Sequence, residues 1–139
     1  MSAFQTVLKA FAAVIVVVCL LHISLGTKAE LLLGAQWPAG VAFDAVLDSQ
    51  DRFYGAVFFI FACVLWLCAN DLRRYAPVLK AALAVFFLGA VARLISFAAV
   101  GPPSALIYSL WAVEVIAPPV LWLWMQRCLA RTPGDWDRR

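Results

Sequence analysis

Four apolar stretches, each close to the length of a membrane-spanning helix, dominate this sequence. A helix needs about 20 mainly apolar residues to cross the hydrocarbon core of a bilayer. Arg93 is the only charged residue in the third stretch, and Glu114 is the only one in the fourth. The stretches cover residues 4–25, 53–69, 81–100 and 105–126. The sequence therefore predicts an all-α fold, a polytopic bundle of four transmembrane helices in a single membrane domain spanning residues 1–139.

The composition supports a membrane protein. Hydrophobic residues make up 65% of the chain and charged residues 14%, whereas a soluble domain is roughly 45–50% apolar and about 25% charged. The net charge of +3 is small, and no basic patch mixes with aromatic residues, so we expect no nucleic acid partner. The four cysteines form no CxxC pair, which favours packing over thiol–disulfide chemistry.

The first apolar stretch has an alternative interpretation as a secretory signal peptide. Its unbroken apolar core is short, residues 10–21, and Lys9 precedes it. The sequence Thr27-Lys28-Ala29 matches a small-residue cleavage site poorly. We therefore expect this helix to be retained.

The distribution of basic residues predicts the orientation, because Lys and Arg in short loops mark the cytoplasmic side. The opposite side has Lys28 and Arg52 only. We expect both termini in the cytoplasm, a longer outer loop from Gly26 to Gln50 between the first two helices, and a loose tail, residues 127–139. Eight basic residues fall on the cytoplasmic side in this arrangement: Lys9, Arg73, Arg74, Lys80, Arg127, Arg131, Arg138 and Arg139.

Arg93 and Glu114 require an explanation, because a charge at the centre of a membrane helix costs roughly 2.5–3.5 kcal/mol on insertion scales. The third and fourth helices are joined by a short turn, so they should pack antiparallel and bring the two residues to a similar depth. The sequence therefore predicts an Arg93–Glu114 ion pair. Such a pair can be purely structural and fix the register of the helices.

Other polar residues fall in the same outer half, and we predict that they line an outward-facing pocket with the ion pair as its floor. Gly89 would let a neighbouring helix or ligand come close. Pro118 and Pro119 would interrupt the fourth helix and free backbone carbonyls beside Glu114. The candidate ligand-binding residues are Arg93, Glu114, Arg52, His22, Ser96, Tyr108 and Gln50.

The sequence offers little support for a metal site or a cofactor, and we expect none. There is one histidine, and the acids are scattered. The spacing of Asp48 and Asp51 resembles a helix N-cap followed by an acid three residues later. We therefore expect Asp44, Asp48 and Asp51 to serve local structure and solvation.

Several short motifs in this chain resemble the domain of unknown function 4345, a family of small bacterial four-helix inner-membrane proteins. They are Arg52-Phe53-Tyr54-Gly55, then Gly89-Ala90-Val91-Ala92-Arg93 with Ser96 and Gly101-Pro102, and finally Glu114. The family pattern prefers a second glycine where this chain has Ala90. The resemblance implies a single four-helix unit in a bacterial inner membrane and supplies no activity.

Three hypotheses for the function follow from the residues. The protein binds a lipid or another amphiphile in the outer pocket, with the head near Arg93 and Arg52. Alternatively it is a cofactor-free membrane isomerase, with Glu114 as general acid or base together with His22 or Tyr108. A third hypothesis is a structural accessory subunit that packs on a membrane-protein partner or on further copies of itself.

Overall fold

The structure is a computed structural model that describes residues 2–35 and 44–130. Within these residues it is helical and contains no strand. Four of the helices, all except the short α2, are long and apolar enough to cross a membrane. This confirms the predicted fold class and makes the protein a multi-pass membrane protein. The helices are α1 (Ala3–Leu25), α2 (Lys28–Leu32), α3 (Ala45–Asn70), α4 (Leu72–Val100) and α5 (Ala105–Ala130).

Two of the spanning helices begin earlier than their apolar stretches predict. α3 begins at Ala45, where the Asp44 carboxylate accepts a hydrogen bond of 3.1 Å from the Val46 amide. α4 begins at Leu72, where the Asp71 carboxylate accepts one of 3.1 Å from the Arg74 amide. Apolar stretches reveal only the part of a helix that lies in lipid, and both helices continue into polar turns. The helix cap expected at Asp48 is therefore wrong, because Asp44 fills that role.

The last helix also differs from the prediction. Pro118 and Pro119 lie inside α5, which continues as a helix through both, so the expected interruption is wrong. α5 ends at Ala130 and includes the first residues of the tail that we expected to be loose. The remaining tail, 131–139, and residues 36–43 of the outer segment lie outside the described residues.

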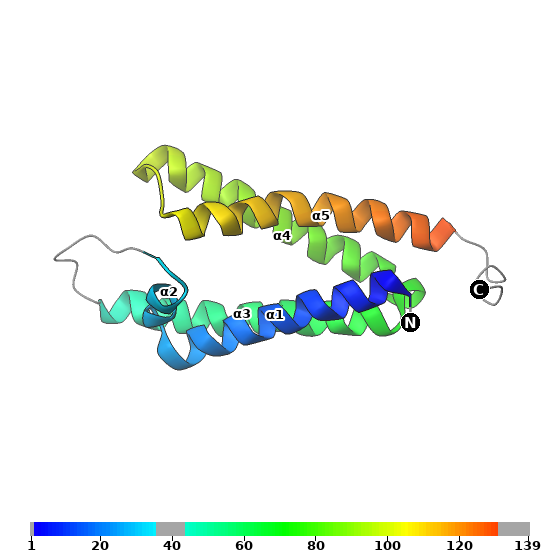
Figure 1. The fold of residues 1–139 in the computed structure, drawn as a ribbon, viewed down its shortest axis with the longest axis horizontal. Helices are drawn as coiled ribbons and strands as arrows, with labels where there is room; N and C mark the ends of the chain where they lie inside the picture. The colour runs from blue at the N-terminus through cyan, green and yellow to red at the C-terminus, as the bar shows by residue number, and fades with distance from the viewer. Residues whose placement is uncertain (1, 36–43, 131–139) are drawn as a thin grey trace.

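The helices form two pairs, α1 with α3 and α4 with α5, as Figure 1 shows. Only Asp71 separates α3 from α4, and this connection brings the pairs together. The pairs lie close at the end where α1 begins and α5 ends, and they diverge towards the end that carries α2 (Figure 1). We call the first the basic end, because Lys9, Arg73, Arg74, Lys80 and Arg127 lie there, and the second the α2 end.

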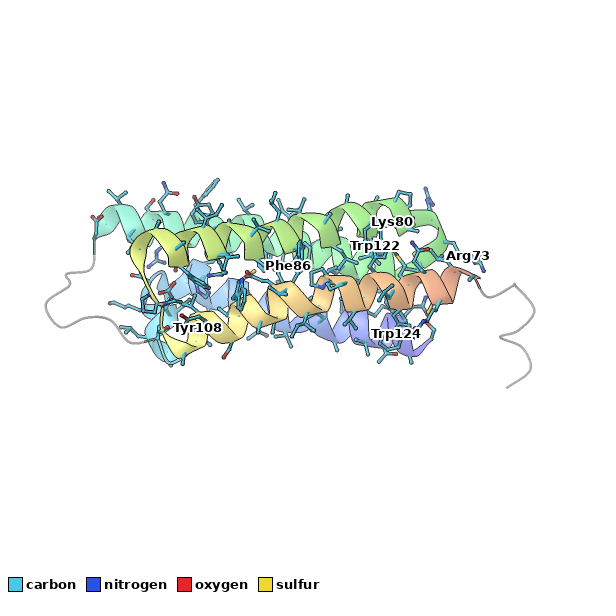
Figure 2. All side chains as sticks on the ribbon, turned by 90° about the horizontal axis from the view of Figure 1, so that it is seen from above. Arg73, Lys80, Phe86, Tyr108, Trp122 and Trp124 are labelled. Atoms are coloured by element: carbon cyan, nitrogen blue, oxygen red, sulfur yellow. The ribbon has the colours of Figure 1, made fainter. Side chains whose placement is uncertain are left out.

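The hydrophobic core is concentrated towards the basic end. In α4 beyond Ala90 and in α5 before Pro118, no residue is fully buried, although the structure describes both segments completely. Phe86 closes the core near the middle of the bundle (Figure 2), with its ring centroid 5.0 Å from that of Phe61 and 6.0 Å from that of Phe11. The core residues are Phe4, Leu8, Ala12, Ile15, Cys19, Ala62, Leu65, Cys68, Ala69, Ala76, Leu79, Leu83, Leu121 and Met125.

The outer surface of the bundle suits lipid. Large apolar side chains such as Val14, Ile60 and Val85 are 61%, 63% and 66% exposed. At the basic end, the ammonium of Lys9 lies 5.3 Å from the ring centroid of Trp66, and that of Lys80 lies 5.8 Å from that of Trp122. Lysines that reach past an aromatic ring at a helix end are typical of a membrane–water interface.

Candidate functional site

The predicted ion pair between Arg93 and Glu114 is confirmed. Arg93 Nε donates to Glu114 Oε2 at 2.8 Å and to Oε1 at 3.1 Å, joining α4 to α5. The Glu114 side chain is 12% exposed and that of Arg93 is 36% exposed. The two helices are antiparallel, and the short connection from Gly101 to Ser104 brings both residues to the same depth towards the α2 end.

Arg93 does not use all of its hydrogen-bonding capacity in this pair. Its two terminal Nη groups donate to no atom in the described part of the chain. Beside the pair, the Trp111 indole donates to the carbonyl of Ala90 at 3.2 Å. The ring centroid of Phe97 lies 6.0 Å from that of Trp111 and 5.4 Å from that of Tyr108. These aromatic contacts hold the outer halves of α4 and α5 together where no core residue does.

A second polar cluster lies on the other helix pair, where α1, α2 and α3 meet. One ring nitrogen of His22, one carboxylate oxygen of Glu30 and one of Asp51 lie within 4.8 Å of one another. All three residues are partly buried. His22 Nδ1 lies 2.8 Å from the carbonyl oxygen of Val18, one turn earlier in α1.

The electrostatics of Glu30 connect the two polar groups. Burial raises the pKa of the Glu30 carboxyl above its usual range, and the neighbouring charge of Asp51 raises it further. His22 and the guanidinium of Arg93 act on the same carboxyl in the opposite direction and lower its pKa. The guanidinium of α4 therefore acts electrostatically on the cluster of the opposite helix pair.

Arg52 has a structural role, and the ligand-binding role we expected for it stays a prediction. Its Nη1 donates to the carbonyls of Ile23 and Ser24, at 2.8 and 2.9 Å, at the end of α1. Its Nε donates to Asp48 Oδ2 at 2.8 Å, and Asp48 Oδ1 accepts from the Thr27 amide at 3.1 Å. Arg52 and Asp48 thus attach the start of α3 to the end of α1.

The remaining candidates take different positions. His22 lies in the cluster, whereas Gln50 and Ser96 are exposed, and Tyr108 is 43% exposed with its ring against Phe97. The ligand-binding role assigned to these residues stays a prediction, as does the catalytic role of Glu114 and His22. The sequence reasoning missed Glu30, and it assigned Asp51 to helix capping.

The close approach of helices expected at Gly89 occurs instead at Gly55. A Cβ added to Gly89 would meet only Glu114 Oε2, at 3.9 Å. A Cβ on Gly55 would lie 3.0 Å from the Cβ of His22 and 3.3 Å from the carbonyl oxygen of Cys19. Gly55 therefore allows α3 to lie directly against α1, and it determines where His22 sits.

An apolar groove of about 390 Å³ lies between α4 and α5. It is separate from both polar groups. Phe87 of α4 and the two prolines of α5 contribute to its wall. Trp122, which Figure 2 labels near the basic end, marks its position along the bundle. The complete lining is Leu83, Ala84, Phe87, Pro118, Pro119, Trp122 and Leu123.

Comparison with known proteins gives one match. A family model described as "Domain of unknown function (DUF4345)" matches residues 3–125, nearly the whole chain. No curated protein and no solved structure matches the sequence.

Proposed function

Because the chain belongs to the DUF4345 family, whose function is unknown, we propose a function from the site itself: the protein binds a lipid or another amphiphile in the outer half of the bundle. The polar head lies near Arg93, and the apolar part lies between the diverging helix pairs. The unused Nη groups of Arg93 are the observation that carries this proposal. An arginine in an apolar helix is stabilised by acceptors, and a carboxylate, phosphate or carbonyl head supplies them.

The arrangement of the core supports the same proposal. The side chains around Phe86 end the main core halfway along the bundle, and α4 beyond Ala90 and α5 before Pro118 bury no residue completely. An apolar tail in this region would contact helix faces that the core leaves uncovered. Arg52, the other arginine expected at the head group, is held by backbone carbonyls and by Asp48. The proposal therefore assigns the head to Arg93 alone.

Native mass spectrometry from mild detergent tests this function. We expect the wild-type protein to retain a lipid or other amphiphile, and the double variant Arg93→Gln/Glu114→Gln, which keeps the helices without stranding a charge, to lose it. Retention should fall by at least about tenfold, because a hydrogen bond to a charged group contributes about 1.5–3 kcal/mol. Ser109→Ala, on the exposed face of α5, is the matched control and should retain the ligand.

A wild-type protein that carries no amphiphile, or equal retention by both variants, would contradict the proposal. The accessory-subunit hypothesis would then gain support, because the groove between α4 and α5 also offers an apolar surface to a partner helix. In that case the same spectra should show a second protein chain or further copies of this one.

The orientation belongs to the same proposal: the basic end faces the cytoplasm of a bacterial inner membrane. Five of the eight basic residues expected on that side lie at this end among the described residues, and the other three follow α5 in the chain. Reporter fusions at Leu72 and at the C-terminus should both give a cytoplasmic signal. A fusion at Gly101, in the turn between α4 and α5, is the control and should give the opposite signal. A periplasmic signal at Leu72 would show that the orientation is the opposite of the proposed one.

A further inference from the structure

We propose that His22, Glu30 and Asp51 bind a divalent transition-metal cation at the α2 end. The three residues come from three helices, α1, α2 and α3, and their ligand atoms lie within 4.8 Å of one another. Ligand atoms about 2 Å from a common ion must lie close together in this way. This inference concerns a different cluster from Arg93 and Glu114 and does not rest on the amphiphile proposal.

The orientation of His22 supports a metal ligand. Its Nδ1 lies 2.8 Å from the Val18 carbonyl oxygen, which only accepts hydrogen bonds, so Nδ1 carries a proton and donates it. In the neutral ring, Nε2 then holds the free lone pair. Histidines that bind metals commonly donate their other ring N–H to a backbone carbonyl or carboxylate, which fixes the tautomer and the ring orientation.

Asp51 supplies an independent observation. Its Oδ2 is shielded from solvent and has no hydrogen-bond partner in the described part of the chain. A buried carboxylate oxygen without a partner is strongly disfavoured, and a coordinated cation satisfies it. The neighbouring acids differ: Asp44 accepts a hydrogen bond from the Val46 amide, and Asp48 binds Arg52 and Thr27.

The charges around the cluster also favour a cation. Glu30 and Asp51 place two carboxylates beside each other, and Arg52 of the same region is already paired with Asp48. Arg93 acts on Glu30 from the opposite helix pair, where it is paired with Glu114. A divalent ion between Glu30 and Asp51 removes the repulsion between these carboxylates.

The ligand set indicates the class of metal. An imidazole with two carboxylates suits Zn²⁺ and the neighbouring divalent transition metals, whereas Mg²⁺ and Ca²⁺ prefer oxygen ligands alone. Three protein ligands leave at least one coordination position for water or for an oxygen of a bound molecule. The three residues are partly exposed, which gives the ion a path from the aqueous side.

Zinc titration of the purified full chain in detergent, after removal of metals with a chelator, tests the site. We expect stoichiometric binding by the wild type and by Asp44→Asn, an exposed acid outside the cluster. Asp51→Asn and Glu30→Gln should each bind at least about tenfold more weakly, since loss of even an outer-shell partner weakens metal sites about 10–100-fold. Zinc should also raise the thermal midpoint of the wild type and of Asp44→Asn, but not of Asp51→Asn.

Cobalt absorption distinguishes this site from the four free cysteines. We expect d–d bands typical of nitrogen and oxygen ligands, without a thiolate charge-transfer band. Binding that is unchanged in both Asp51→Asn and Glu30→Gln, a thiolate band, or no stoichiometric binding by the wild type would each overturn the proposal. The wild-type cobalt spectrum still distinguishes nitrogen and oxygen ligands from thiolates if a variant fails to fold.

Discussion

Glu114→Ala should lower the free energy of unfolding by about 3 kcal/mol, because an unpaired charge within a membrane helix costs roughly 2.5–3.5 kcal/mol. The loss comes from Arg93, which the substitution leaves without the carboxylate that accepts from its Nε at 2.8 Å. Arg93→Ala should have a similar effect by leaving Glu114 unpaired in a largely buried position. Thermal or denaturant unfolding in mixed micelles measures both.

The double variant Arg93→Ala/Glu114→Ala should be more stable than the sum of the two single effects predicts. Side chains in direct contact typically show a coupling energy of about 0.5–3 kcal/mol, and we expect the upper part of this range. Ser96→Ala combined with Glu114→Ala is the control cycle. Ser96 is exposed on α4, so its effects should add. Strict additivity for Arg93 and Glu114 would show that the pair does not form in the membrane protein.

Gly55→Leu should produce the second large effect. Even the first carbon of the new side chain would lie 3.0 Å from the Cβ of His22 and 3.3 Å from a backbone oxygen of Cys19. α3 would have to move away from α1, and overpacking of this kind typically costs about 1–3 kcal/mol. Because His22 moves with α1, zinc affinity should fall together with the unfolding midpoint.

Gly89→Ala is the matched control, since its Cβ would meet only Glu114 Oε2, at an ordinary contact distance of 3.9 Å. We expect no loss of stability there, and a gain of up to roughly 0.5–1 kcal/mol because alanine favours a helix interior over glycine. A Gly55→Leu variant as stable as wild type would mean that α1 and α3 do not pack closely at this level.

The sequence was sufficient for the four spans and for the Arg93–Glu114 pair. Both follow from the free-energy cost of placing polar groups in hydrocarbon, which is larger than the effects of individual caps and turns. The antiparallel arrangement across a short turn then determined which two charges would meet. Helix starts were not predictable in this way, because the polar turns from Ala45 and from Leu72 lie outside the apolar stretches.

The His22–Glu30–Asp51 cluster shows what the apolar pattern could not reveal. Glu30 lies on the short α2, in a segment that we expected to be an outer loop. Asp51 was interpreted as part of a helix cap because α3 was expected to begin after it. Once Asp44 starts the helix, Asp51 becomes an interior position facing α1 and α2. Ser96 lies on an exposed part of α4, beyond the last fully buried residue of that helix, and its place in the pocket stays a prediction.

The divergence of the two helix pairs gives the described part of the molecule a wedge shape along the direction in which its helices cross the bilayer. The pairs are joined through Asp71 and packed around a core near the basic end, so the protein occupies more area in the leaflet at the α2 end than in the other (Figure 1). A change in the angle between the pairs therefore alters the area that the protein occupies in the leaflet at the α2 end far more than the area that it occupies in the other leaflet.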